Sequence, residues 1–169
     1  MTQHEEIALL PAYEIRKKLE SKDLSPVEVV EACLQQIERY NSVINAVVTV
    51  NEKAIEEAKK LENAKEKGLL YGLPVGIKDV TETAGIRTTY GCRLYDNYIP
   101  EEDALVVQRL KAAGAIILGK TNTPEFAAGG NTFNEVFGRT CNPWNPELSA
   151  GGSTGGGAAG LITGMIALA

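Results

Sequence analysis

The sequence predicts an α/β fold in which helices cover a mixed, largely parallel β-sheet. Short β-branched or apolar runs, which are typical of strands, alternate with longer segments of helical periodicity. Such alternation favours strands that lie parallel and are connected by helices. The 169 residues are 44% hydrophobic and 23% charged, as in an ordinary globular chain. No repeat or flexible linker divides the chain, so residues 1–169 are expected to contain no internal domain boundary.

The clearest helix is predicted to begin after Ser25, which can cap it, with Pro26 in the first position and Glu28 completing a capping box. Cys33 lies on its apolar stripe and is expected in the core. The remaining elements follow in chain order. They are a strand over 44–50, a helix from Asn51 to Gly68, a strand over 73–80, a helix over 101–115 with acids in its first turn, and a buried strand over 115–120. An ordered loop region starts at Thr121, and a buried apolar helix over 158–169 ends the chain.

Composition also argues against several functions. The net charge of −5 and the lack of a basic run argue against direct binding of nucleic acid. The first residues lack the basic and apolar parts of a signal peptide, and the three cysteines have no metal-type spacing, so a cytoplasmic protein without a metal site is expected. The only histidine, His4, lies in a polar leader that is expected to be mobile. Any catalytic base is therefore expected to be a lysine or a carboxylate.

Residues 149–160, "SAGGSTGGGAAG", form an uncharged segment rich in glycine. A P-loop is excluded because Gly157 and Ala158 stand where Lys and Ser or Thr are needed, and the G-x-G-x-x-G match over 155–160 lacks a preceding strand. Glycines four apart also occur in membrane helices, but the apolar run here is too short to favour a membrane span. The remaining interpretation is a loop that exposes one hydroxyl, Ser153 or Thr154, which needs a base elsewhere.

Lys78 is the candidate base. It ends the apolar run "LPVGIK", and the period of two in a strand places Lys78 and Asp79 on opposite faces of the sheet. Burial of the Lys78 face would lower the pKa of its amine toward that of a usable base. The alternative is a lysine at a strand end whose amine reaches out to water.

"GLPVGIKDV", "GKTNTPEFAAGGNTFNEVFGRTCNPWNP" and "SAGGSTGGGAAG", in this order, resemble the N-terminal part of the amidase signature family. The resemblance covers about residues 70–169. It implies a Ser–cis-Ser–Lys triad in which Lys78 is the base and Ser153, with a cis peptide bond before it, is the bridging serine. It also implies that the attacking serine and its oxyanion hole lie beyond residue 169, so that only the N-terminal portion of the amidase fold is present.

The resemblance suggests further contacts and marks two departures from the family's pattern. Candidate substrate-binding residues are Ala127, Gly129, Gly130, Gly152 and Thr154; tight loop packing is an equal alternative for the small residues near 127–130. Thr154 replaces the family's second serine, and Gly157 stands where Ser, Ala or an acid is common. Arg139 is expected to order the loop region rather than bind a carboxylate.

The predicted function is hydrolysis of a carboxylic amide to an acid and ammonia or an amine, through an acyl-serine intermediate and without cofactor or metal. The motifs look closer to a general amidase than to the A subunit of a glutamyl-tRNA amidotransferase, which is the first alternative and would need partner subunits. A catalytically inert fragment or partner protein is the second alternative. The expected ligand is a small-molecule amide; no membrane partner is expected, and homo-oligomer formation is left open.

Overall fold

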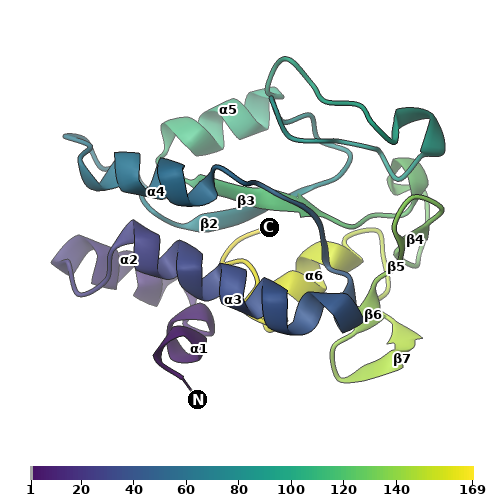
Figure 1. Ribbon diagram of the computed structural model, residues 1–169, viewed down its shortest axis with the longest axis horizontal. Helices are drawn as coiled ribbons and strands as arrows, with labels where there is room; N and C mark the ends of the chain where they lie inside the picture. Colours follow the sequence, from purple (N-terminus) through teal and green to yellow (C-terminus); the bar gives the residue numbers. More distant parts are fainter. Residues whose placement is uncertain (1) are drawn as a thin grey trace.

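The computed structural model describes residues 2–169 and has the predicted α/β architecture (Figure 1). The helices are α1 (Gln3–Ala8), α2 (Ala12–Ser21), α3 (Pro26–Ile44), α4 (Ala54–Glu62), α5 (Leu105–Ala112) and α6 (Gly155–Ile162), with short 3-10 turns η1 (Arg93–Tyr95) and η2 (Glu125–Ala127). The strands are β1 (Val47–Val50), β2 (Pro74–Lys78), β3 (Ile116–Thr121), β4 (Phe133–Asn134), β5 (Gly138–Arg139), β6 (Cys141–Asn142) and β7 (Asn145–Ser149).

A three-stranded mixed sheet forms the centre of the structure, in the order β1-β3-β2. β2 runs parallel to β3, whereas β1 runs antiparallel to it. The register places Lys78 beside Thr121 at one end of the sheet, and it shifts at Gly119, where the chain bulges. A Cβ at Gly119 would lie 2.2 Å from the Thr49 carbonyl oxygen, so β1 and β3 can approach this closely only because Gly119 has no side chain.

Apolar side chains cover both faces of this sheet. Helices α3, α4 and α6 pack on the face that carries Ile116 and Leu118, and Cys33 lies in this cluster as predicted. Helix α5 covers the opposite face through Val107, which meets Val75 and Ile77 of β2 (Figure 1). A bulge beyond Leu118 shifts the register of β3 by one residue. Lys120 is therefore paired with Ile77 and lies on the sheet face opposite to that of Lys78.

The N-terminal segment is more ordered than its composition suggests. His4 lies in α1, a helix that begins with a capping box between Thr2 and Glu5. The His4 ring nitrogen Nδ1 lies 2.9 Å from Gln35 Oε1 of α3. The expectation of a mobile leader was therefore wrong, because apolar residues of α1 such as Ile7 pack into the core together with α2 and α3.

Two predicted helices are shorter than expected. The helix expected from Asn51 to Gly68 is α4, and the Asn51 side chain accepts a hydrogen bond from the Lys53 N–H at 3.0 Å instead of capping the helix itself. In the helix expected over 101–115, the acids precede α5 rather than filling its first turn. The Asp103 carboxylate instead accepts the Ala84 N–H at 2.7 Å, which ties this loop to the segment that follows β2.

The end of the chain also differs from the prediction of one buried helix over 158–169. Helix α6 ends at Ile162, and Gly164 turns the chain with a φ of +71°. The Gly76 N–H then donates to the Leu168 carbonyl at 2.9 Å, so the last residues add a parallel bridge to the free edge of β2. The loop region after Thr121 contains two small antiparallel sheets, β4-β5 and β6-β7. Within residues 2–169, no helix has both the length and the apolar character needed to cross a membrane.

Candidate active site

The structure brings Lys78 and Ser153 together, although they are far apart in sequence. Lys78 is the last residue of β2, and its side chain reaches the segment that precedes α6. Its Nζ lies 2.8 Å from Ser153 Oγ and 3.1 Å from Thr154 Oγ1. Burial lowers the pKa of the Lys78 amine below its ordinary value. The arrangement therefore holds a partly desolvated amine within hydrogen-bond reach of two hydroxyl groups.

The glycine-rich segment is shaped by close backbone contacts. The Gly152–Ser153 peptide bond is cis, and Gly151 has a φ of +76°. A Cβ at Gly152 would lie 2.9 Å from the Gly129 carbonyl oxygen, and one at Gly156 would lie only 2.4 Å from the Asn122 backbone nitrogen. The start of α6 therefore sits directly on the end of β3, where a larger residue would push it away.

A buried polar network supports this segment from behind. Asn122 donates from Nδ2 to Thr140 Oγ1 at 3.0 Å, and Asn134 donates to Asn122 Oδ1 at 2.8 Å. Thr132 Oγ1 accepts the Gly155 N–H at 3.0 Å, which satisfies one of the free donors at the start of α6. Arg139 donates to the carbonyl oxygens of Pro146 and Glu147 and so orders the loop, as expected.

Asp79, the residue after Lys78, points to the other side of the sheet and is fully buried. Its carboxylate accepts the Thr89 hydroxyl at 2.6 Å and the Thr89 N–H at 3.2 Å. Burial raises the pKa of this carboxyl group, and its hydrogen bonds to Thr89 oppose that shift. Within the described residues no ion pair joins Asp79 to Lys78, so this carboxylate does not hold the amine in its charged form.

Lys120 is a second lysine of the sheet, and the sequence analysis did not single it out. It is completely buried near the end of β3, and its Nζ donates to Thr88 Oγ1 at 2.9 Å, to Thr83 Oγ1 at 3.1 Å and to the Thr81 carbonyl oxygen. Burial lowers the pKa of its amine to about 8, despite the opposing charge of Asp79. Its only signal was a lysine that ends the apolar run "AIILGK". These hydrogen bonds of Lys120 attach the loop after β2 to β3. They lie on the side of the sheet opposite to Lys78.

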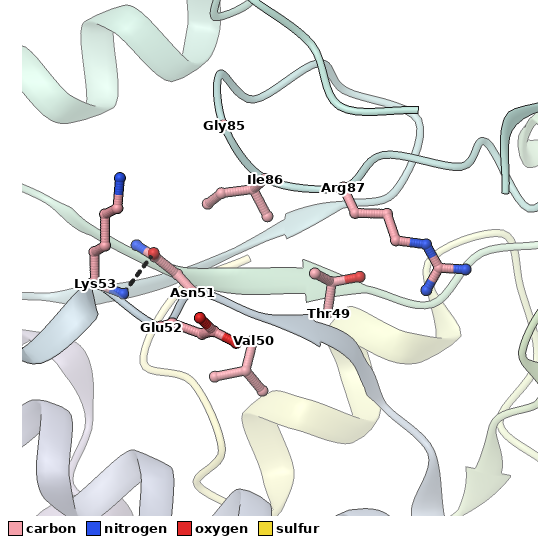
Figure 2. Close-up of a pocket in the computed structure, with 8 residues that line it drawn as sticks. All are labelled: Thr49, Val50, Asn51, Glu52, Lys53, Gly85, Ile86 and Arg87. Atoms are coloured by element: carbon pink, nitrogen blue, oxygen red, sulfur yellow. Dashed lines mark hydrogen bonds between the residues drawn. The ribbon is translucent and has the colours of Figure 1, made fainter. Parts of the chain in front are cut away.

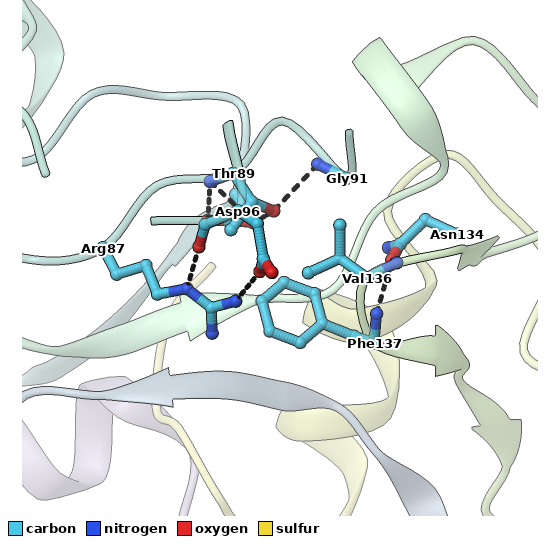
Figure 3. Close-up of polar contacts among 8 residues, drawn as sticks. Arg87, Thr89, Gly91, Asp96, Asn134, Val136 and Phe137 are labelled. Atoms are coloured by element: carbon cyan, nitrogen blue, oxygen red, sulfur yellow. Dashed lines mark hydrogen bonds and ion pairs between the residues drawn. The ribbon is translucent and has the colours of Figure 1, made fainter. Parts of the chain in front are cut away.

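The same loop is held further along by a second group of polar contacts, drawn in Figure 3. Arg87 forms an ion pair with Asp96, and its guanidinium lies 4.8 Å from the centre of the Phe137 ring. The Thr89 hydroxyl accepts the Gly91 N–H at 3.0 Å. These contacts connect the segment that follows Lys78 with the loop region that precedes the glycine-rich segment.

The predicted substrate contacts are only partly brought together. Gly129 packs against Gly152, and Gly130 lies beside it on a cavity of about 360 Å³. Thr154 contacts Lys78 directly. Ala127 ends η2 with a φ of +58° and does not line that cavity. Thr154 thus contacts Lys78, and Gly152 and Gly129 lie together beside Ser153, whereas the cavity at Gly129 and Gly130 is lined by neither Lys78 nor Ser153. The binding of substrate by any of these residues stays a prediction.

A separate pocket of about 210 Å³ lies between the end of β1 and the loop after β2 (Figure 2). It is lined by Thr49, Val50, Asn51, Glu52, Lys53, Gly85, Ile86 and Arg87. Neither Lys78 nor Ser153 contributes to it, so the candidate active site is elsewhere. Among the residues of the described range, no three His, Cys, Asp or Glu side chains form a group that could hold a metal ion.

The family follows from comparison with known proteins. Residues 28–169 match the family model described as Amidase, so this chain belongs to the amidase family. A curated relative, the A subunit of glutamyl-tRNA(Gln) amidotransferase from Carboxydothermus hydrogenoformans, is 44% identical over 97% of this chain and 35% of its own length. The chain thus spans about a third of the length of that relative.

Solved structures agree with this placement. A 6-aminohexanoate cyclic dimer hydrolase is similar with a TM-score of 0.86 and 34% identity, covering 94% of this chain and 33% of its own. The A subunit of glutamyl-tRNA(Gln) amidotransferase from Thermotoga maritima is similar with a TM-score of 0.80 and 35% identity, covering 95% of this chain and 33% of its own. Both share the fold described above, and each is about three times as long as the present chain.

Proposed function

We propose that residues 1–169 supply the base and the proton relay of an enzyme that hydrolyses a carboxylic amide through an acyl-serine. The observation that carries the proposal is the 2.8 Å contact between Lys78 Nζ and Ser153 Oγ. Two features support it: burial lowers the pKa of Lys78, and the Asp79 carboxylate is engaged on the other side of the sheet. A neutral lysine can accept a proton from a neighbouring hydroxyl at neutral pH.

The relay needs an attacking serine, which we place in the part of the family domain that follows these residues. Its oxygen bonds to the amide carbon while its proton passes to Ser153 Oγ, and the Ser153 proton passes to Lys78 Nζ. When the C–N bond breaks, Lys78 returns a proton through Ser153 to the leaving nitrogen, and an acyl-serine remains. Water then bonds to the acyl carbon while its proton passes through Ser153 to Lys78; the ester C–O bond breaks, the proton returns to the attacking serine, and the acid is released. No metal or cofactor enters these steps.

The test uses a full-length polypeptide in which residues 1–169 are followed by the rest of the family domain. Release of ammonia or amine is measured from a panel of aliphatic, aromatic and peptide amides. Lys78→Ala and Ser153→Ala should each lower kcat by about 10²- to 10⁴-fold, as expected for loss of acid–base catalysis. Lys59→Ala, which removes an exposed lysine of α4, is the matched control. Parent-like rates in either site variant, with an unchanged melting temperature, would contradict the proposal.

The 169-residue chain by itself offers a second test. A fluorophosphonate probe, which labels activated serines, should leave it unmodified by intact-mass measurement, because the attacking serine is proposed to lie elsewhere. Labelling of Ser153 would show that this serine is itself the nucleophile. If the polypeptide still hydrolyses no amide after the downstream segment is added, the alternative of a catalytically inactive partner protein is favoured.

A second candidate is favoured by the identity of 44% to the A subunit of an amidotransferase. In that case the ammonia would pass to a charged tRNA with the help of partner subunits, rather than being released. Co-purification of partner proteins, and glutamine-dependent amidation of glutamyl-tRNA only in their presence, would support this reading. Amide hydrolysis by the full-length polypeptide alone, without partners, would support the general amidase.

A further inference from the structure

Thr154 gives the Lys78 amine a second hydroxyl neighbour. A neutral amine has one lone pair and two N–H bonds, so it can accept from Ser153 and donate to Thr154 at the same time. The two contacts, at 2.8 Å and 3.1 Å, lie on different hydroxyl groups. Together they define the rotation of the amine about its Cε–Nζ bond. If Lys78 acts as the proposed base, an N–H donated to Thr154 leaves its lone pair free to face Ser153.

The Thr154 hydroxyl is not used for the usual task of a residue in its position. Thr154 immediately precedes α6, where threonine commonly caps the helix by accepting a backbone N–H. Here its side chain makes no such capping hydrogen bond, and its Oγ1 accepts from Lys78 instead. The free Gly155 N–H at the helix start is satisfied by Thr132. The Thr154 hydroxyl is therefore left available for the lysine.

The methyl group of Thr154 explains how this hydroxyl is oriented. Threonine carries Oγ1 and Cγ2 on the same carbon, so the position of the methyl group fixes the direction of the hydroxyl. A Cβ at Gly157, one turn along α6, would lie 3.1 Å from Thr154 Cγ2, closer than ordinary van der Waals contact. A side chain at residue 157 would therefore require the Thr154 methyl group to shift by a few tenths of an ångström. The same Cβ would lie 3.1 Å from Ala169 Cβ.

We propose that Thr154 and Gly157 act as one steric unit that positions the Lys78 base. Gly157 accommodates the methyl group, the methyl group fixes the side-chain rotamer, and the rotamer directs Oγ1 to Lys78. Thr154 is a positioning residue in this scheme. The inference rests on the proposed role of Lys78 as the base, and it assigns to Thr154 a task other than substrate binding.

The test is a double-mutant cycle in the full-length polypeptide. Gly157→Ala should force the Thr154 methyl group to move and lower kcat by about tenfold, less than the loss of about 10²- to 10⁴-fold expected for complete loss of acid–base catalysis. Thr154→Ser keeps the hydroxyl but frees its rotamer, and should lower kcat by only about threefold. Gly157→Ala should then cause no further loss in the Thr154→Ser background, because the methyl group is gone. An equal loss in both backgrounds would overturn the steric unit and point to Ala169 as the obstacle.

A pH profile separates positioning from a general loss of structure. The Thr154 oxygen stabilises the ammonium form of Lys78 more than the neutral amine, because a hydrogen bond to a charged donor is stronger. Thr154→Val should therefore lower the pKa of Lys78 further, and yet it should lower kcat because the lone pair is no longer aimed. A parent-like kcat in Thr154→Val would refute the proposal.

The pKa is also measured without activity, by acetylation of Lys78 in the 169-residue chain as a function of pH, with Lys59 as the reference. An unchanged Lys78 pKa in Thr154→Val would refute the role of the Thr154 hydroxyl. If Lys78→Ala retains activity, the proposed function fails. If Lys78→Ala is inactive but Thr154→Val and Gly157→Ala resemble the parent, only the present inference fails. Thermal melting of each variant identifies any loss of fold. A Gly157→Ala variant that loses no further kcat in the Thr154→Ser background must also have a folded site.

Discussion

Replacement of Lys120 by methionine should change how the stability of this protein depends on pH. Lys120 is completely buried, and burial lowers the pKa of its amine to about 8 in the folded protein. In the unfolded chain the amine is expected to have an ordinary pKa of about 10.4. The folded protein therefore releases this proton at lower pH than the unfolded chain does.

The sign and size follow from proton linkage. The pKa of Lys120 is about 8 in the folded protein and about 10.4 in the unfolded chain. Between these two pH values the unfolded chain binds more protons than the folded protein, so the free energy of unfolding rises with pH. The full shift of about 2.4 pKa units corresponds to about 3 kcal/mol, of which about 2.5 kcal/mol appears between pH 7 and pH 10. Below pH 8 both states carry the charge, and the burial penalty is fully present. Methionine has no proton to release, so Lys120→Met should lack this contribution.

The assay is urea unfolding of the 169-residue chain at several pH values from 7 to 10. The quantity compared is the unfolding free energy of the parent minus that of Lys120→Met. This difference should increase with pH by about 2 to 3 kcal/mol. Taking a difference removes the opposing contribution of Cys33, whose pKa is raised to about 12 by burial and which is present in both proteins. Lys59→Met, at an exposed position, should run parallel to the parent.

A difference that stays flat over this pH range would contradict a lowered pKa for Lys120. It would mean that Lys120 keeps its proton in the folded protein up to pH 10, with Asp79 and the threonine oxygens compensating fully for burial. A difference that falls with pH would show that the pKa of Lys120 is raised rather than lowered. The absolute effect of Lys120→Met at pH 7 is a separate quantity, because the substitution also leaves the oxygens around Thr83 and Thr88 without their donor.

Three further predictions concern stability and reactivity. Ser25→Ala removes one half of the capping box of α3 and should cost about 1 kcal/mol in urea unfolding; a change near zero would mean that the cap contributes little. Gly156→Ala should destabilise by about 2 kcal/mol or more, because its Cβ would lie 2.4 Å from the Asn122 nitrogen, whereas Gly130→Ala, with open space around it, should melt like the parent. Cys33, which is fully buried, should react with a thiol reagent only on unfolding, and labelling at the native rate of a free thiol would contradict its place in the core.

Local patterns predicted the elements whose causes are local. The capping box of Ser25 and Glu28 marked the start of α3, and the alternation of Lys78 and Asp79 was enough to place them on opposite faces of the sheet. The less successful predictions concern ends of elements. Helix α4 ends at Glu62 rather than near Gly68. The charged residues that follow, Lys65, Glu66 and Lys67, are exposed, so no burial of apolar surface extends the helix.

The candidate site itself was predicted in part. The motifs singled out Lys78 and Ser153, and the fold brings these residues together; their catalytic role stays a prediction. Lys120 was read only as the end of a buried strand. Its burial depends on the bulge at Gly119 and on a loop that follows a different strand, and neither can be read from the residues around it.

Local residue patterns alone specify the alternation of strands and helices, the glycine-rich segment over 149–160 and the chemical groups available for catalysis. Caps, apolar spacing and residue type act over a few residues, so a linear pattern is enough to express them. Packing of the whole chain is what turns the Thr154 hydroxyl to Lys78 instead of letting it cap α6, and what buries Lys120 on the opposite side of the sheet. These outcomes depend on strand order, register and close backbone contacts between distant segments, which become defined only when the whole core packs.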